Sequence, residues 1–295
     1  MKKTTLLFII IVILSTFFCQ QKLNAQQSTP AQAEVWRVID VINKIKAEVG
    51  IDWMKETRDN VIAGDPNTEI TGIATTFMST LTVLQKAKAM GCNFVISHEP
   101  TFYSHTDDLK THEKDPVQIA KLKFIKENNM VIWRFHDHQH RMKPSDQIYD
   151  GVIEKMGWKK YQMADKTLLN IPPTSLGQIV KILNKNMGAK TARIVGKPEM
   201  MVSKVGLALG AAGTGTHFTV LENTNCELLI VGESNEWETV PYIQDAITLG
   251  QKRSLIVLGH ADSEEAGMKN ARDWLRGFYP KTKIEFIEAR NPFWR

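Results

Sequence analysis

Hydrophobic residues along the chain follow two alternating patterns. Short runs of consecutive apolar residues, typical of buried strands, alternate with longer segments in which apolar residues recur every three or four positions, as on one face of a helix. The expected strands lie at residues 70–76, 94–97, 130–134, 202–209, 226–231, 254–258 and 283–287. The expected helices lie at residues 35–49, 81–90, 116–127, 145–156, 176–186, 238–249 and 263–278. This alternation predicts the α/β class, with helices covering the sheets.

The two halves of the chain repeat the same order of segments. Gly72 and Gly206 each lie 20 residues before a cysteine that opens a repeated segment. The matching segments are Cys92–Glu99 with Cys226–Glu233, without a gap, and His136–His140 with His260–Glu264. We therefore predict a duplicated α/β unit, with halves 26–165 and 166–295 related by a pseudo-two-fold axis. Two such halves would bring their strand ends into one cleft, where ligand sites commonly lie.

The first 25 residues have the pattern of a secretory signal peptide. Lys2 and Lys3 precede an apolar run, and Ala25 offers a small residue at the cleavage point. The apolar run is shorter than the ~20 residues of a membrane span, although an uncleaved N-terminal anchor is the alternative. Residues 1–25 are therefore predicted to be removed, leaving a periplasmic or secreted protein with no membrane association.

Charge and cysteine content narrow the possible partners. Cleavage would lower the formal net charge from +5 to +2, because residues 1–25 hold three lysines and no acid. No basic stretch is interleaved with aromatic residues, so nucleic acid is not expected as a partner. Cys92 and Cys226 each begin a strand with a buried pattern, which favours two packed thiols over a disulfide.

Histidine and glutamate gather where the expected strands end. Pro100 must end the strand at 94–97, which leaves His98 and Glu99 at its tip. The candidate metal ligands, all at or just past strand ends, are His98, Glu99, His136, His138, His140, His260 and Glu264. Imidazole with carboxylate suits Zn, Fe, Mn, Ni or Co better than Ca or Mg. The number of candidates is sufficient for two ions with bridging carboxylates.

Several of these features have a simpler interpretation. His136, His138 and His140 alternate as residues of a strand do, so all three would then face one side and bind metal adventitiously. Asp262 or Ser263 can cap the helix at 263–278, which would leave His260 in the preceding loop. The glycine-rich segment 210–216 is either an anion cradle or a tight turn.

Together these motifs identify a resemblance to a known family. They are Gly72-Ile-Ala-Thr-Thr, Ile96-Ser-His-Glu-Pro, the His136–His140 segment, Val205–Gly215, Val231-Gly-Glu and Gly259-His-x-x-x-Glu. From about Val35 to Ile287, the chain resembles the Nif-three-like family of dinuclear metal-centre proteins, often named GTP cyclohydrolase I type 2. The resemblance implies a Nif-three-like fold, a two-metal site and a hexameric ring with its sites facing an inner cavity.

The chain departs from the family pattern at two ligand positions. Where the family usually has Ser-His-His-Pro, the second histidine is Glu99 here, and where it has His-Thr-x-x-Asp, the aspartate is His140. The ligands that the resemblance implies are His98, Glu99, His140, His260 and Glu264. Three histidines and two carboxylates are thus retained. Met78 also stands where the family tends to have an acid.

The residues and the resemblance together favour an exported hydrolase of a small, possibly nucleotide-like or cyclic amide, substrate. Water activated by two divalent transition metal ions would be the nucleophile, with His138 or His136 as general base or orienting residue. An exported protein would meet little GTP, so GTP is not the expected substrate. The alternative is a non-catalytic metal-binding protein or a scaffold ring.

Overall fold

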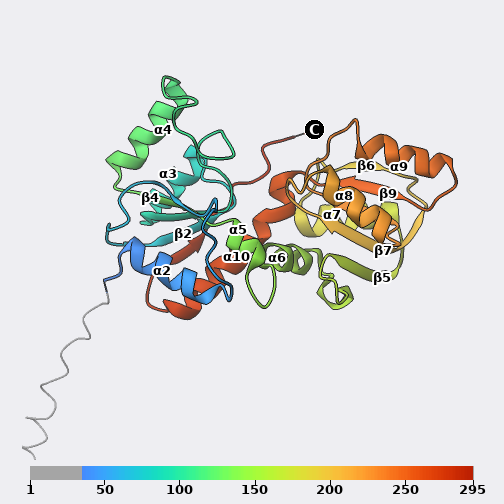
Figure 1. Ribbon diagram of the computed structural model, residues 1–295, viewed down its shortest axis with the longest axis horizontal. Helices are drawn as coiled ribbons and strands as arrows, with labels where there is room; N and C mark the ends of the chain where they lie inside the picture. Colours follow the sequence, from blue (N-terminus) through green and yellow to red (C-terminus); the bar gives the residue numbers. More distant parts are fainter. Residues whose placement is uncertain (1–34, 295) are drawn as a thin grey trace, which may run out of the picture. The chain divides into compact units, whose positions relative to one another are not determined.

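The computed structural model describes residues 35–294, so the predicted signal peptide at residues 1–25 lies outside the described part. The described chain contains two five-stranded sheets with helices packed against them (Figure 1). No helix among the described residues combines the length and apolarity needed to cross a bilayer. The α/β class expected from the alternating pattern is confirmed.

The first sheet has the strand order β1-β4-β3-β2-β10. Its strands are β1 (Val61–Ala63), β2 (Ile73–Thr76), β3 (Phe94–Ser97), β4 (Val131–Arg134) and β10 (Ile284–Phe286). Strands β2, β3, β4 and β10 run parallel, and β1 pairs with β4 antiparallel. Every residue of β2, β3 and β4 is buried. Burial on both faces explains why these strands are continuous apolar runs in the sequence.

The second sheet has the strand order β5-β7-β8-β9-β6. Its strands are β5 (Leu168–Ser175), β6 (Arg193–Val195), β7 (Met201–Ala208), β8 (Leu228–Val231) and β9 (Ser254–Val257). Strands β7, β8 and β9 run parallel, and β5 and β6 pair antiparallel at the two edges. The sequence did not predict β5, because it contains Pro172 and Pro173. Both are tolerated since β5 is an edge strand whose register shifts between Asn170 and Thr174.

Helices connect the strands and cover the sheets (Figure 1). They are α2 (Val38–Glu48), α3 (Leu81–Ala89), α4 (Pro116–Glu127), α5 (Asp137–Arg141), α6 (Gln147–Met156), α7 (Leu176–Met187), α8 (Thr214–Asn223), α9 (Thr239–Thr248) and α10 (His260–Phe278), with a 3-10 helix η1 (Lys159–Tyr161). Thr80 caps α3 by accepting a hydrogen bond from the Val83 amide. Asp115 caps α4, whose first residue is Pro116.

The parallel strands β2-β3-β4 and β7-β8-β9 occur in the same order in the two sheets, as a duplicated α/β unit requires. The strand register of the second half nevertheless differs from the one that the sequence alignment predicts. In the first half Ile73 pairs with Phe94, and the alignment matches these two residues with Leu207 and Leu228. In the structure, however, Leu228 pairs with Val205. The duplication is therefore present in the topology, with a two-residue difference between the first two strands of each half.

The last helix and strand return to the first sheet. Strand β10 pairs with β2, although the predicted division at residue 165 assigns residues 284–286 to the C-terminal half. The physical reason is the length of α10, whose 19 residues span roughly 28 Å at 1.5 Å per residue. Helix α10 begins just after β9 of the second sheet and contacts β2 and β10 of the first. The C-terminal segment therefore completes the N-terminal sheet.

Helices α6 and α10 cross at two glycines. A Cβ atom on Gly151 would lie 2.7 Å from the Ala266 carbonyl oxygen, and one on Gly267 would lie 2.4 Å from the Ile148 Cα. The absence of side chains at both positions lets the two backbones touch. This contact fixes α6, and α5 just before it, against the helix that begins at His260.

Candidate metal centre

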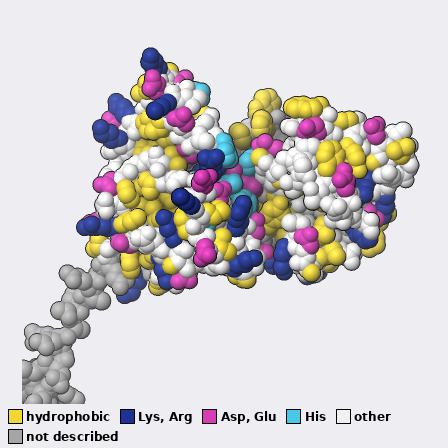
Figure 2. Space-filling view, viewed as in Figure 1, with side chains coloured by type: hydrophobic (Ala, Val, Ile, Leu, Met, Phe, Trp, Pro, Cys, Tyr) yellow, Lys and Arg dark blue, Asp and Glu magenta, His cyan; other side chains and the backbone are white. Residues whose placement is uncertain are grey.

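Three segments deliver histidine and glutamate side chains to one place. His98 and Glu99 follow β3. After β4, His136 is the N-cap residue of α5 and His140 lies within that helix. His260 and Glu264 occupy the first turns of α10, which follows β9. On the face shown in Figure 2, histidine side chains gather with acidic side chains beside them. Because β3 and β4 are parallel neighbours, their carboxyl ends meet at one edge of the sheet.

His98 is the central residue of this cluster and is fully buried. Its Nδ1 lies 2.9 Å from Gln139 Oε1 and 3.2 Å from the Phe135 carbonyl oxygen. Both neighbours are acceptors, so Nδ1 carries the proton and Nε2 is left with a free lone pair. Nε2 has no hydrogen-bond partner and lies 3.4 Å from Glu264 Oε2. An unpartnered lone pair that faces a carboxylate oxygen in the interior is costly, and a cation held between the two atoms would remove that cost.

The potential ligand atoms form two overlapping groups. One consists of His98, His136 and His140, and the other of His98, Glu99 and Glu264. Within each group the ligand atoms all lie within 4.8 Å of one another. The residues present therefore fit a transition metal site made of imidazole and carboxylate.

The two carboxylates each lie between imidazoles from different segments. Glu99 Oε1 is 3.2 Å from His260 Nε2 and 3.5 Å from His136 Nε2. Glu264 Oε2 is 2.9 Å from His260 Nε2, and its Oε1 is 3.8 Å from His140 Nε2. Each carboxylate thus lies within reach of imidazoles from two segments, as in sites where carboxylate and imidazole hold a metal.

The electrostatics of the cluster keep both carboxylates charged. Burial raises the pKa of Glu99, but hydrogen bonds from His136 and His260 outweigh it and hold the pKa well below its usual range. Burial likewise raises the pKa of Glu264, but the hydrogen bond from His260 outweighs it and holds the pKa well below its usual range. Burial lowers the pKa of His260, whereas hydrogen bonds to Glu233, Glu264 and Glu99 raise it to about 12. His260 thus holds a proton where a metal cation could bind, as expected at a site where protons and metal ions compete for the same ligand atom.

Each imidazole that faces the cluster is oriented by an acceptor behind it. His140 Nδ1 lies 2.9 Å from Asp146 Oδ2, and His260 Nδ1 lies 2.9 Å from Glu233 Oε1. His136 Nδ1 lies 2.9 Å from the carboxylate of Asp137. Such partners fix the tautomer and direct Nε2 to the metal in metal-binding proteins. His98, whose Nδ1 faces Gln139, has the same arrangement, so all four histidines of the cluster are oriented in this way.

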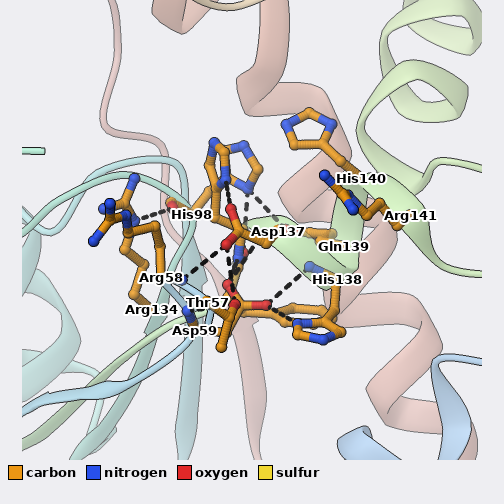
Figure 3. A network of polar contacts seen from close by, with 12 residues as sticks. Thr57, Arg58, Asp59, His98, Arg134, Asp137, His138, Gln139, His140 and Arg141 are labelled. Carbon is orange, nitrogen blue, oxygen red and sulfur yellow. Dashed lines mark hydrogen bonds and ion pairs between the residues drawn. The ribbon is translucent and has the colours of Figure 1, made fainter. Parts of the chain in front are cut away.

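His138 is not part of the cluster, which corrects the prediction that it acts as base. Residues 137–141 form the helix α5 rather than a strand. Positions 136 and 140 therefore share one face, and position 138 lies on the opposite face. His138 is fully buried, its ring stacks on Trp53 at 3.5 Å, and its Nε2 accepts a hydrogen bond from the Met54 amide. Figure 3 shows His138 turned towards Asp59 and His140 turned away from it.

The residue that imposes this helix is Asp59. Its Oδ1 accepts hydrogen bonds from the amides of His136 at 2.5 Å and Asp137 at 2.9 Å, and its Oδ2 accepts one from the His138 amide at 2.9 Å. Asp59 Oδ2 also lies 2.6 Å from His138 Nδ1. A buried carboxylate thus binds the first free amides of α5 and one of its side chains.

Other supporting residues were also missed from the sequence. Asp146 had a usable signal, because its position before α6 is typical of an N-cap, and it accepts hydrogen bonds from Ile148 and Tyr149. Arg134 is buried, and its guanidinium lies 3.4 Å from Glu99 Oε2. Arg134 ends a buried strand and Asp59 lies in an irregular segment, so nothing in the local pattern indicated their roles.

Helix α10 begins three residues earlier than expected. Neither Asp262 nor Ser263 caps it, because Gly259 takes the N-cap position with φ +99. His260 and Glu264 are therefore one turn apart on a single helix and face the same way. Ser263 instead donates to the His260 carbonyl and accepts a hydrogen bond from the Gly210 amide.

Gly210 makes room for the Glu264 carboxylate. Its φ is +63, and a Cβ atom built on it would lie 1.9 Å from Glu264 Oε1. The glycine-rich segment thus serves as a turn packed against a candidate ligand, and α8 begins at Thr214 directly after it. This position requires glycine for its backbone angle and for the space it leaves.

We expect Gly210→Ala to weaken metal binding about tenfold to a hundredfold, because the new methyl group must displace the Glu264 carboxylate. The left-handed backbone adds about 1–2 kcal/mol of strain. Elemental analysis after dialysis against a weak chelator measures the loss. Gly215→Ala is the matched control, since no atom lies within 4 Å of its added Cβ. Equal metal retention in both variants would contradict this account of Gly210.

The sequence profile of Duf34/NIF3 (NGG1p interacting factor 3) matches residues 36–292. A protein of Clostridium perfringens named GTP cyclohydrolase 1 type 2 homolog is 22% identical over 270 residues, which cover 86% of this chain and 97% of that protein.

Solved structures show the same architecture. A Bacillus cereus protein related to NIF3 superposes with a TM-score of 0.70 at 12% identity, covering 89% of this chain and 100% of the other. A hypothetical protein of Staphylococcus aureus superposes with a TM-score of 0.69 at 15% identity, again covering 89% of this chain and 100% of the other. At these identities the likeness establishes the fold alone.

Proposed function

Since this chain belongs to the Duf34/NIF3 family, we propose that it is a hydrolase of a small molecule that depends on two divalent transition metal ions. The observation that carries the proposal is His98 Nε2, a buried lone pair without a partner that belongs to both groups of potential ligands. The relatives named GTP cyclohydrolase 1 type 2 homolog support hydrolysis as the reaction class.

The residues proposed to hold the two ions are His98, Glu99, His140, His260 and Glu264. His98 and His260 would each offer one imidazole nitrogen, and Glu99 and Glu264 would offer the carboxylate oxygens between them. A divalent ion in such a site supplies Lewis acidity and lowers the pKa of water to about 7.

His136 is the residue proposed to take the proton from the attacking water. It belongs to one group of potential ligands but is not among those that the family pattern implies. Asp137 Oδ1 lies 2.9 Å from its Nδ1 and orients the ring. Burial raises the pKa of Asp137, but hydrogen bonds from the Arg58 amide, His136 and Thr57 lower it to about 2. A carboxylate that stays charged stabilises an imidazolium beside it.

The substrate and setting are proposed from the sequence. The basic start and apolar run of residues 1–25 support export to the periplasm or the medium. In that setting we propose a substrate other than GTP, because exported proteins meet little of it. The family resemblance supports a hexameric assembly.

The proposed function predicts hydrolysis that disappears with the metal. Protein purified without a metal-binding tag should carry about two transition metal ions per chain and hydrolyse at least one member of an ester, phosphodiester and amide panel. Removal of metal by a chelator should abolish turnover, and addition of Zn, Mn, Fe, Ni or Co should restore it. Bound metal without turnover on the whole panel would reject the hydrolase and support a metal-binding role.

A further inference from the structure

A cavity of about 710 Å³ opens beside the metal cluster. Its lining includes Phe77 before α3, Arg193 on β6 and His260 at the start of α10, together with residues 289–293, which follow β10. His260 is shared with the proposed metal site, so a ligand in this cavity would reach the ions from one side. The volume is within the range of ligand pockets, which is roughly 300–1,000 Å³.

Residues 289–293, which we call the tail wall, are fastened to the helix that carries the ligands. Glu265 Oε1 accepts hydrogen bonds from the amides of Ala289 at 2.6 Å and Arg290 at 2.9 Å. Asn291 Nδ2 donates to Asp262 Oδ2 at 2.8 Å and to Thr191 Oγ1 at 2.9 Å. Glu265 and Asp262 both belong to α10, as do His260 and Glu264. The tail wall is therefore a built part of the cavity, positioned by the same helix as the metal ligands.

The lining of the cavity combines two aromatic residues with two exposed arginines. Phe77 is almost fully buried and lies edge-on to the His260 ring, with centroids 5.3 Å apart. Phe293 of the tail wall is 75% exposed and presents a second aromatic face. Arg193 and Arg290 line the same cavity, and their side chains are 61% and 74% exposed. Aromatic rings prefer to stack with other flat rings, and guanidinium groups bind carboxylate, phosphate and sulfonate.

The charged side chains that line the cavity are paired with other residues of the chain. Among the described residues that line it, Glu233 is the one acid, and it is engaged by His260 Nδ1 at 2.9 Å. The arginines pair with exposed acids outside the lining, Arg193 with Glu236 and Arg290 with Glu288 at 3.2 Å. Exposed pairs of this kind contribute only about 0–1 kcal/mol, so an incoming anion can replace them.

We propose that this cavity binds the substrate of the hydrolase, and that the substrate is a small aromatic molecule with an anionic group. The aromatic body lies against the exposed ring of Phe293, and the anionic group pairs with Arg290 and Arg193. That the bound molecule is a substrate rests on the proposed function, whereas its binding can be measured without turnover. The tail wall thereby determines which molecules reach the metal centre.

The test measures binding of naphthalene-1-sulfonate, a fluorescent aromatic anion that is a poor metal ligand and cannot be hydrolysed, to the metal-loaded protein. Saturable binding at submillimolar concentration is expected. Arg290→Gln should raise the dissociation constant about tenfold and Phe293→Ala at least fivefold. The neutral naphthalene-1-sulfonamide should bind Arg290→Gln and the native chain equally.

Trp294→Ala is the matched control for Phe293→Ala, because Trp294 is 91% exposed and lines a neighbouring cavity instead. Its dissociation constant should stay within a factor of two of the native value, and all variants should keep their metal content. Absence of saturable binding to the native chain overturns the proposal, as does equal binding by Arg290→Gln and Phe293→Ala. Because the test measures affinity, it remains valid even if the protein hydrolyses no member of the panel. If turnover is sensitive to chelator but the variants bind naphthalene-1-sulfonate as the native chain does, the cavity proposal is rejected and the hydrolase proposal stands.

Discussion

Replacement of His98 by alanine is expected to remove at least nine-tenths of the bound metal and to reduce any hydrolysis below detection. His98 is the member common to both groups of potential ligands, and its Nε2 points at Glu264 without another partner. Its loss would remove a candidate ligand from both groups. Loss of one ligand in a site with few protein ligands commonly prevents stable binding.

Elemental analysis of the purified variant measures the effect, and the melting temperature of the metal-free protein shows whether the fold survives. His112→Ala is the control, because His112 is an exposed histidine outside the cluster. It should keep the native metal content. Native metal content in the His98 variant would refute the proposed centre, whereas loss in both variants would point to a general defect in folding.

Asp59→Ala is expected to destabilise the protein by about 3–5 kcal/mol, the largest effect on stability that we predict for a residue outside the cluster. Its side chain is almost fully buried and accepts hydrogen bonds from three backbone amides and the His138 ring. Alanine would leave those donors in the interior without acceptors. The melting temperature should fall by about 10 °C, given roughly 2–4 °C per kcal/mol for a domain of this size.

Urea unfolding of the metal-free protein separates this effect from metal binding. Asp59→Asn should fall between the native protein and the alanine variant, because the amide oxygen keeps part of the hydrogen bonding. Asp245→Ala, at an exposed position of α9, should stay within about 0.5 kcal/mol of the native stability. A loss of less than 1 kcal/mol in Asp59→Ala would show that water readily replaces the carboxylate.

Much of the fold was predictable because the central strands are buried on both faces. Strands of that kind are recognisable as apolar runs, so β3 and β4 were located within one residue. The missed strands β1, β5 and β6 are edge strands that are short or interrupted by proline. Strands β1 and β6 have three residues each, too few to show a period, and the two prolines of β5 oppose a strand assignment.

The site was predictable in its location but not in its internal arrangement. The ends of parallel strands meet at one edge, which is why His98 and His260 were expected near each other. The orientation of α5 depends on Asp59, which lies 77 to 79 residues earlier in the chain. The spacing of residues within 136–140 carries no information about an acceptor so far away in the sequence. Without it, the same residues are compatible with a strand or a helix. His138 was misassigned for this reason.

The two departures from the family pattern fall in different parts of the cluster. Glu99 belongs to the group with His98 and Glu264, and His140 belongs to the group with His98 and His136. His140 also has its own acceptor, Asp146, behind the ring. The exchanged residues are thus integrated into the cluster rather than left beside it, which supports a changed donor set in a retained site.

The return of β10 to the first sheet has a consequence for how the protein is made. Strand β2 occupies a position between β3 and β10, and its outer edge stays unpaired until residues 284–286 have been synthesised. At roughly 5–20 residues per second, the interval between the two strands is on the order of 10–40 s. During that time the nascent chain exposes an apolar strand edge that invites intermolecular pairing. Completion of the N-terminal sheet is therefore a late step, and the nascent protein is most vulnerable to aggregation before it.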